Sequence, residues 1–270
     1  MRTIYRLCFF SFLVFISFRL NAQCFGPNKA FQVGEIIDYN VAYHWGVIWL
    51  EAGKVRFSVK EKNYQNRPVY HLIGEGHTLK KHEWLYKVDD YFQSYVDKET
   101  LKPLWFRRDT YEGGYSVDNR YTFDYQNNTI VGSIENSDDP RKEITLEMPN
   151  CVMDVMSLVY LARTIDFDNL AVDDTVGVTS IIDGEIYNLY IRYLGREHLE
   201  LKDGRTFNTQ KFSALLVEGT IFKGGEDMFV YVTDDRNKIP IMVEAKILIG
   251  SVKAIISNVQ GSIDYPESVF

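Results

Sequence analysis

The chain contains three cysteines, whose thiols have a wide range of covalent chemistry. Cys8 lies in an apolar N-terminal segment, Cys24 follows that segment, and Cys151 begins a stretch with helical spacing. At a helix N-terminus the Cys151 thiol would have a lowered pKa, and beside a histidine it would act as a nucleophile. The alternative is a structural disulfide between Cys24 and Cys151. The compartment in which the protein folds decides between the two.

The first 22 residues have the features of a secretory signal peptide. Two arginines form a basic start, residues 7–18 are almost wholly apolar, and Ala22 is the small residue that cleavage requires. We therefore predict cleavage after Ala22 and a mature chain of residues 23–270 in the periplasm or elsewhere in the cell envelope. Because no later apolar run reaches spanning length, no transmembrane segment is expected in the mature chain.

This predicted location favours the disulfide over the nucleophile. Cys8 leaves with the signal peptide, and an oxidising compartment favours pairing of the two cysteines that remain. A bridge between Cys24 and Cys151 would close a loop of roughly 130 residues and hold the mature N-terminus in place. A lipid anchor on Cys24 is not expected, because the long polar Gln23 precedes it where a small residue is needed.

The remaining polar residues predict no catalytic, metal or cofactor site. His71, His77 and His82 lie close together in the sequence, but on a strand His82 does not share a face with the other two, and no zinc spacing is matched. The adjacent acidic pairs are typical of turns and lack the spaced ligands of a calcium loop. The stretch "GGYSVDN" lacks the second glycine of a nucleophile elbow. We therefore assign no catalytic residue, no metal and no cofactor.

The four tryptophans are the candidate ligand-binding residues. Tyr and Trp side chains line β cores, and they also line surfaces that contact lipids or sugars. A curved sheet with an incompletely filled interior would hold an amphiphile or a glycan. The tryptophans that we consider for this contact are Trp45, Trp49, Trp84 and Trp105.

The charge of the chain limits the choice of partners. The formal net charge is −7, and removal of residues 1–22, which carry three arginines and no acid, lowers it to −10. An acidic surface argues against nucleic acid, and also against anionic lipid, as a partner.

Most of the chain has the period-two patterning of half-buried antiparallel strands. In "IIDYNVAY", Ile37, Tyr39, Val41 and Tyr43 alternate with more polar neighbours, and other segments repeat the pattern. Turn residues separate these segments about every ten residues, as in a sandwich, barrel or wrapped sheet. The strongest turn signals are Asn127-Asn128, Asp183-Gly184 and Asp203-Gly204.

One segment has helical spacing instead. Its apolar residues at that spacing are Val152, Val155, Met156 and Val159. We predict a helix over about 151–163, with Asn150 as its N-cap, lying on the β-sheet. The predicted fold class is mainly β: an antiparallel wrapped sheet or barrel-like domain with one helix, formed as a single domain by residues 23–270.

Several stretches resemble an exported bacterial family known as domain of unknown function 3108. "FQVGEIIDYNVAYHWGVIWLEAG" resembles its opening, with a Gly-Glu pair before a strand. The residues that match its middle and closing sections are Asp154, Val155, Tyr160, Arg163, Asp234, Asp235, Pro240, Gly250, Ser251 and Val252. The resemblance covers about residues 31–262, and "NAQ" before the mature region is similar to exported proteins of Bacteroidetes. It implies an envelope location and a mostly β fold, and it implies no activity.

Three functions are therefore considered. The favoured interpretation is a non-enzymatic envelope protein that binds an amphiphilic or glycan ligand or an unidentified envelope partner. The second is a hydrolase of envelope polymer, which would require carboxylates that face each other across a cleft. The third is a structural subunit of an envelope assembly.

Overall fold

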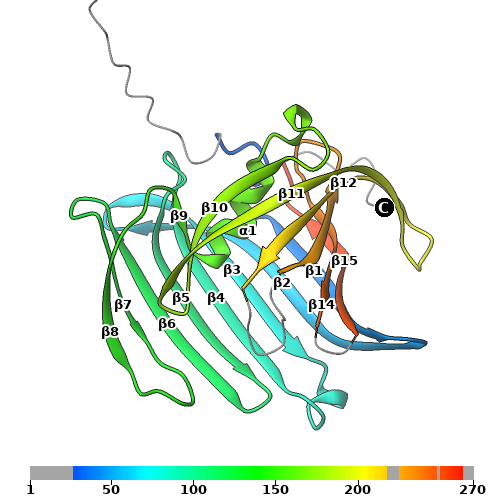
Figure 1. Cartoon of the computed structure of the whole chain (residues 1–270), viewed down its shortest axis with the longest axis horizontal. Coiled ribbons are helices and arrows are strands. Elements are labelled where there is room, and N and C mark those ends of the chain that lie inside the picture. Colours follow the sequence, from blue (N-terminus) through cyan, green and yellow to red (C-terminus); the bar gives the residue numbers. More distant parts are fainter. Residues whose placement is uncertain (1–26, 218–224, 248–249, 264–270) are drawn as a thin grey trace, which may run out of the picture.

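The computed structural model describes residues 27–217, 225–247 and 250–263, which form a curved sheet around a short helix (Figure 1). The strands before the helix are β1 (Ile36–Trp45), β2 (Ile48–Tyr64), β3 (Arg67–Thr78), β4 (Val88–Asp97), β5 (Pro103–Glu112), β6 (Tyr115–Asp124), β7 (Thr129–Ile134), β8 (Lys142–Glu147) and β9 (Val152–Met153). The strands after it are β10 (Thr175–Ile182), β11 (Glu185–Glu200), β12 (Thr206–Leu216), β13 (Gly225–Thr233), β14 (Pro240–Lys246) and β15 (Ser251–Gln260). The helical segments are α1 (Val155–Leu161) and the 3₁₀ turns η1 (Lys80–His82), η2 (Ala162–Thr164) and η3 (Phe167–Asn169).

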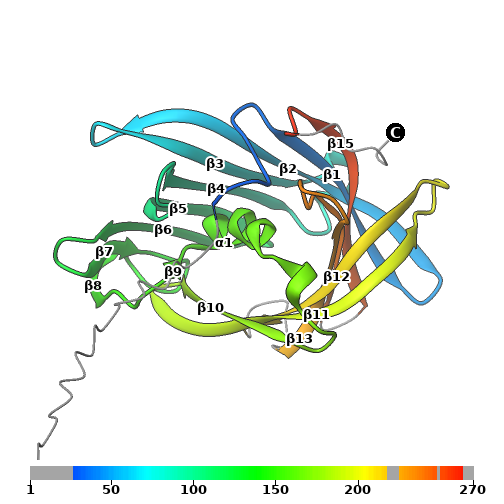
Figure 2. The same ribbon diagram turned by 90° about the horizontal axis from the view of Figure 1, so that it is seen from above.

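Within these ranges, the strands form one sheet in the order β8-β7-β6-β5-β4-β3-β2-β1-β15-β14-β13-β12-β11-β10-β9. All neighbours are antiparallel except β9 and β10. Because β1 pairs with both β2 and β15, the first and last strands are neighbours, and the two sheet edges come from the middle of the chain. Seen from above, the sheet wraps around α1 without closing (Figure 2). The predicted fold class, mainly β and barrel-like with one helix, is confirmed.

The hairpin turns form where the sequence predicts them. Asp183 and Gly184 join β10 to β11 with φ angles of 48° and 83°, the left-handed backbone that a tight two-residue hairpin turn requires. Asn128 takes a φ of 55° between β6 and β7, and Gly204 takes a φ of 86° between β11 and β12. Short-range turn chemistry therefore sets the strand order over most of the sheet.

The helix is shorter than predicted and has a different N-cap. Val152 and Met153 pair with β10 as strand β9, so the backbone becomes helical only after Asp154. Oδ1 of Asp154 accepts a hydrogen bond from the Ser157 amide at 2.8 Å, and Oδ2 accepts one from the Ser94 hydroxyl at 2.7 Å. The prediction of Asn150 as N-cap was wrong, because the sheet edge takes up the residues that follow it.

The buried face of α1 also differs from the predicted stripe. It consists of Met156, Ser157, Tyr160 and Leu161, whereas Val159 is exposed and Val155 is half-buried. Met156 packs so closely on β3 that a Cβ added at Gly74 would lie 2.9 Å from its sulfur. The helix therefore fills the interior of the curved sheet and forms one core with the inner faces of β2 to β7.

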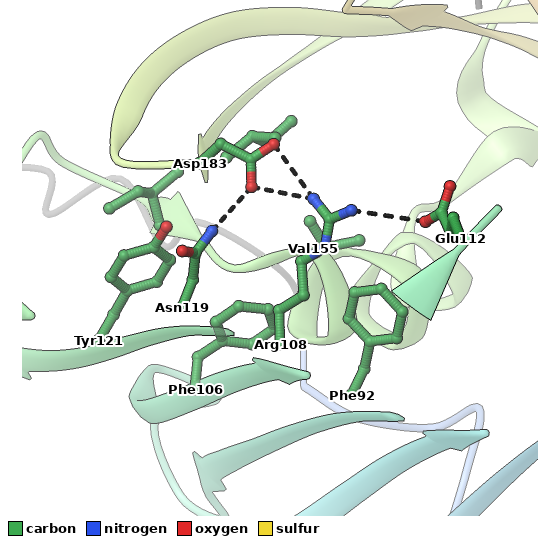
Figure 3. Close-up of a pocket in the computed structure, with 10 residues that line it drawn as sticks. Phe92, Phe106, Arg108, Glu112, Asn119, Tyr121, Val155 and Asp183 are labelled. Carbon is green, nitrogen blue, oxygen red and sulfur yellow. Dashed lines mark hydrogen bonds and ion pairs between the residues drawn. The ribbon is translucent and has the colours of Figure 1, made fainter. Parts of the chain in front are cut away.

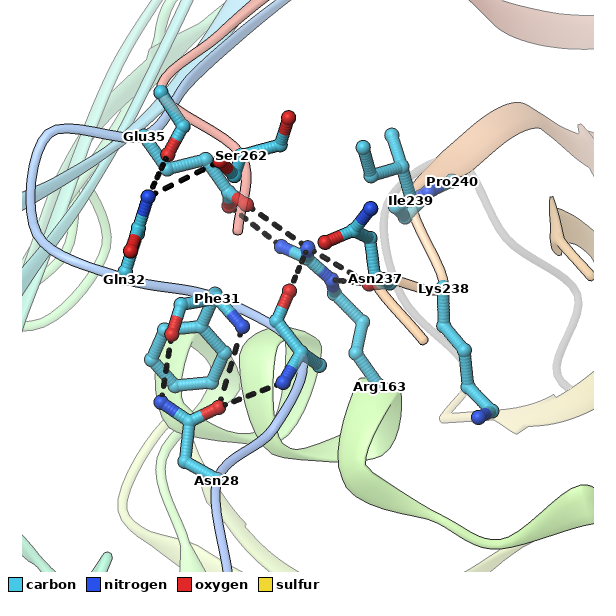
Figure 4. A network of polar contacts seen from close by, with 12 residues as sticks. Asn28, Phe31, Gln32, Glu35, Arg163, Asn237, Lys238, Ile239, Pro240 and Ser262 are labelled. Atoms are coloured by element: carbon cyan, nitrogen blue, oxygen red, sulfur yellow. Dashed lines mark hydrogen bonds and ion pairs between the residues drawn. The ribbon is translucent and has the colours of Figure 1, made fainter. Parts of the chain in front are cut away.

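A buried ion pair holds the end of the helical segment in place (Figure 4). The Arg163 guanidinium donates to both carboxylate oxygens of Glu35, at 2.6 and 3.0 Å, and both side chains are buried. It also donates to the carbonyl oxygen of Ala30 at 2.8 Å and to that of Asn237 at 2.9 and 3.0 Å. Arg163 therefore joins the helical segment to the residues before β1 and to the β13–β14 turn.

Charge pairing outweighs desolvation at this arginine. Burial alone would lower the pKa of Arg163, but the adjacent Glu35 carboxylate raises it by charge attraction and hydrogen bonding, and the net direction is upward. Arg163 therefore stays charged in the interior, where the Glu35 carboxylate balances its charge. Loss of one partner of a buried pair leaves an uncompensated buried charge, which costs about 3–5 kcal/mol.

Cys151 lies in the turn before β9 with a φ of 61°, not at the first residue of the helix. Its predicted partner, Cys24, lies outside the described residues, as does the predicted signal peptide. The disulfide, the cleavage site and the absence of a lipid anchor therefore stay predictions.

We expect Arg163→Met to lower the free energy of unfolding by about 3–5 kcal/mol, because it leaves Glu35 buried without its cation. Arg196→Met is the matched control, since Arg196 pairs with Asp168 and Asp234 at the surface. The control should unfold close to the parent in urea. Equal effects of the two substitutions would contradict a special role for the buried pair.

Candidate functional site

A pocket opens between the inner face of β4 to β6, the start of α1 and the tip of the β10–β11 hairpin (Figure 3). Its volume is about 210 Å³. The residues that line it are Phe92, Phe106, Arg108, Glu112, Asn119, Tyr121, Val155, Ile181, Ile182 and Asp183. Since a water molecule occupies about 30 Å³, the pocket has room for roughly seven water-sized groups.

The apolar part of the lining comes from the sheet and from α1. The rings of Phe106 and Tyr121 stack with their centroids 5.6 Å apart. The Tyr121 hydroxyl accepts a hydrogen bond from the Gly184 amide at 2.9 Å, which fixes the tip of the β10–β11 hairpin over the sheet. Val155 contributes from the first turn of α1. This part of the pocket can take up an apolar chain.

The charged part is organised around Arg108. Its guanidinium donates to the two Asp183 carboxylate oxygens at 2.9 and 3.1 Å and to Oε1 of Glu112 at 3.5 Å (Figure 3). Asn119 donates to Oδ1 of Asp183 at 2.8 Å. Arg108 and Glu112 share a face of β5 because their separation is an even number of residues. The lining therefore carries two carboxylates and one cation, an excess of negative charge.

Asp90 adds a carboxyl group beside this cluster. It pairs across the strands with Thr110, which lies between Arg108 and Glu112 on β5. Burial, and next the Glu112 carboxylate, raise the pKa of Asp90 to about 7, although Arg108 acts in the opposite direction. Oδ1 of Asp90 is buried without a hydrogen-bond partner in the described part of the chain. Asp90 therefore titrates near neutral pH and changes the charge next to the pocket.

The two carboxylates that line the pocket share one cation. A pair of catalytic carboxyl groups needs one protonated acid and one free base on opposite sides of a substrate. Here Glu112 and Asp183 both contact the same Arg108 guanidinium, which lies between them. Asp90 has the raised pKa that an acid needs, but it does not line the pocket.

The structure does not bring the four predicted tryptophans together, and none of them lines the pocket. Trp105 stacks on Tyr95 in a separate small cluster, with ring centroids 4.7 Å apart. Trp49 has the Lys202 ammonium 3.4 Å above its ring. Trp45 and Trp84 are exposed at the ends of hairpins. These positions of the four tryptophans do not test their proposed contact with a ligand.

Sequence reasoning missed the pocket residues. Asp183-Gly184 was interpreted only as a turn, and no role was predicted for Arg108. The available signal was the even spacing of Arg108 and Glu112 among the apolar residues of β5, which places two charges on the inner face.

Metal-binding clusters, the predicted histidines and membrane-spanning helices were also considered within the described residues. No group of three or more His, Cys, Asp or Glu side chains within these ranges is arranged to hold a metal ion. His71 contacts Oε1 of Gln93 at 2.9 Å through its Nε2. Among the helices of the described ranges, none has the length and apolar character needed to cross a membrane.

The fold and the pocket define a barrel-like, mostly β protein with an internal helix. The chain belongs to the family described as "Protein of unknown function (DUF3108)", whose model matches residues 38–257. It is also similar to a crystal structure described as a β-barrel-like protein of domain of unknown function DUF1849 from Brucella abortus. That similarity has a TM-score of 0.53 at 8% sequence identity and covers 86% of this chain and 99% of the other, so it shows the fold alone. No curated protein matches the chain.

Most of the residues that carry the family resemblance have structural roles. Glu35 and Arg163 form the buried ion pair, and Asp154 caps α1. Oδ1 of Asp235 accepts hydrogen bonds from the amides of Asn237 and Lys238 and so shapes the β13–β14 turn. Of the matched residues, only Val155 lines the pocket. The family pattern is therefore mainly a pattern of fold.

We expect Asp90→Asn to stabilise the protein at pH 8 and to have no such effect near pH 4. The folded-state pKa of Asp90 is raised from 3.8 to about 7, so its contribution to stability is lost as the pH rises through this interval. Asp90 is only partly buried, and solvent screening reduces the expected gain at pH 8 to about 1–2 kcal/mol.

The measurement is urea unfolding at several pH values. Asp89→Asn is the control, because Asp89 is the exposed neighbour on the opposite face of β4. A gain for Asp90→Asn that is the same at pH 4 and pH 8 would contradict the assignment of the raised pKa to Asp90.

Proposed function

We propose that this chain is an exported, non-enzymatic protein of the cell envelope that binds a small amphiphile in the pocket between α1 and the sheet. The observation that carries the proposal is the division of the pocket into an apolar part and a charged part around Arg108. The predicted signal peptide supports the envelope location.

The charges of the lining favour a cationic head group. Arg108 is already engaged by Asp183 and Glu112, so it offers little to an anionic ligand. A ligand amine would instead meet the excess carboxylate charge, in a site where Phe92 and Phe106 exclude water. The volume restricts the bound portion to roughly seven non-hydrogen atoms.

The polymer hydrolase and the structural subunit predict other outcomes. A hydrolase would need an extended groove for several sugar units, whereas this pocket has a volume of about 210 Å³. A structural subunit would bind no small ligand at all. Ligand titration therefore separates the favoured function from both alternatives.

Isothermal titration with hexylammonium should give a Kd of the order of 1 mM, and hexanoate should not bind. Val155→Phe should abolish hexylammonium binding, because the larger side chain fills the pocket. Val159→Phe is the matched control on the same helix, since Val159 is exposed outside the pocket. Binding of hexanoate in place of hexylammonium, or equal loss in both variants, would disprove the assignment.

Intact mass measurement on protein exported by its native host should show a chain that begins at Gln23 and carries no lipid. Without reduction, thiol labelling of the denatured protein should modify neither Cys24 nor Cys151. A diacylated Cys24 would refute the predicted cleavage. Two labelled thiols would refute the disulfide and reopen the interpretation of Cys151 as a nucleophile.

A further inference from the structure

Three carboxyl groups lie near one cation on the inner face of β4 to β6. Asp183 accepts hydrogen bonds from the Arg108 guanidinium at 2.9 and 3.1 Å, and Glu112 accepts one at 3.5 Å (Figure 3). Asp90 is the third carboxyl group, because its cross-strand partner Thr110 lies between Arg108 and Glu112 on β5. If all three were ionised, three negative charges would face one positive charge. Like charges in a partly buried site oppose each other's ionisation, so one of the three groups tends to hold a proton.

Asp90 is the carboxyl group with the least compensation. Asp183 accepts hydrogen bonds from both Arg108 and Asn119. In contrast, Oδ1 of Asp90 is buried and has no hydrogen-bond partner within the described ranges. Burial is the largest cause of the raised pKa of Asp90, about 7, and the Glu112 carboxylate is the next, whereas Arg108 acts against them. Below neutral pH the proton is therefore held by Asp90.

The other elements around Asp90 add negative charge or none. On β3, Gly76 lies directly opposite Asp90, and a Cβ added there would lie 3.5 Å from Val55 of β2 and 3.8 Å from the Cβ of Asp90. From the β3–β4 connection comes Tyr86, whose pKa is raised by burial and then by nearby carboxyl groups, so its hydroxyl stays neutral. On β4 itself, the Asp89 carboxylate further raises the pKa of Asp90, after burial and Glu112. A second cation in the pocket would therefore change the ionisation of Asp90.

We propose that Asp90 makes the binding of a cationic ligand in the pocket depend on pH, an inference that rests on the proposed function. Glu112 lines the pocket, so a ligand ammonium that approaches it brings positive charge close to Asp90 and favours the ionised form of that carboxyl. By linkage, a proton on Asp90 weakens binding of the cation by the same factor. The pocket therefore binds its ligand more tightly above neutral pH and releases it as the surroundings become acidic.

The test is titration with hexylammonium chloride at pH 5.5 and at pH 8, followed by NMR. The ligand stays positively charged at both pH values, so a change in affinity reports on the protein. We expect binding at pH 8 to be roughly tenfold tighter, the size of effect that one nearby charge has on a carboxyl group. Equal affinity at the two pH values would overturn the pH coupling and leave the proposed function standing. Absence of binding at both would overturn the two together.

Two variants then assign the effect to one residue. Asp90→Asn copies the shape and charge of the protonated carboxyl, so it should bind hexylammonium equally at both pH values, as weakly as the parent does at pH 5.5. Asp89→Asn is the matched control on the opposite face of β4 and should keep the pH dependence of the parent. Asp154, whose pKa burial raises to about 6, also titrates in this range. Persistence of the pH dependence in Asp90→Asn, or its loss in Asp89→Asn, would therefore overturn the assignment to Asp90.

Discussion

The fold depends on the burial of Arg163 against Glu35. The sheet is not closed by strand pairing, and α1 packs against its inner face. Arg163 joins three separate parts of the chain there: the residues before β1, the end of the helical segment and the β13–β14 turn. Loss of either partner would leave an unpaired charge in the interior, which is costly. The ion pair therefore fixes the depth at which the helical segment lies inside the sheet.

The position of the helix in turn creates the pocket. Asp154 is fully buried and caps α1, and burial raises the pKa of this carboxyl to about 6 despite its hydrogen bonds from Ser157 and Ser94. Val155, the next residue, then forms part of the pocket wall, opposite side chains of β4 to β6.

The sequence predicted features that depend on neighbouring residues and missed those that depend on distant ones. Asp183-Gly184 predicted a hairpin because its backbone preference is local. The start of α1 was misplaced because its N-cap is also held by Ser94, 60 residues earlier. Arg108 and Asp183 lie 75 residues apart, so no local pattern connected them. Trp84 was considered for ligand contact because of its type, and its exposed position in the β3–β4 connection leaves that prediction untested.

The central claim is that the buried ion pair fixes α1 inside the sheet, and native-state hydrogen exchange tests it most directly. The Leu158 amide donates to the Asp154 carbonyl oxygen within α1, and the amides of β1 and β15 lie at the junction of the chain's first and last strands. We predict that the α1 amides exchange only by global unfolding, with the same opening free energy as those of β1 and β15. Exchange of α1 through a lower-energy opening, while β1 and β15 stay protected, would contradict the claim.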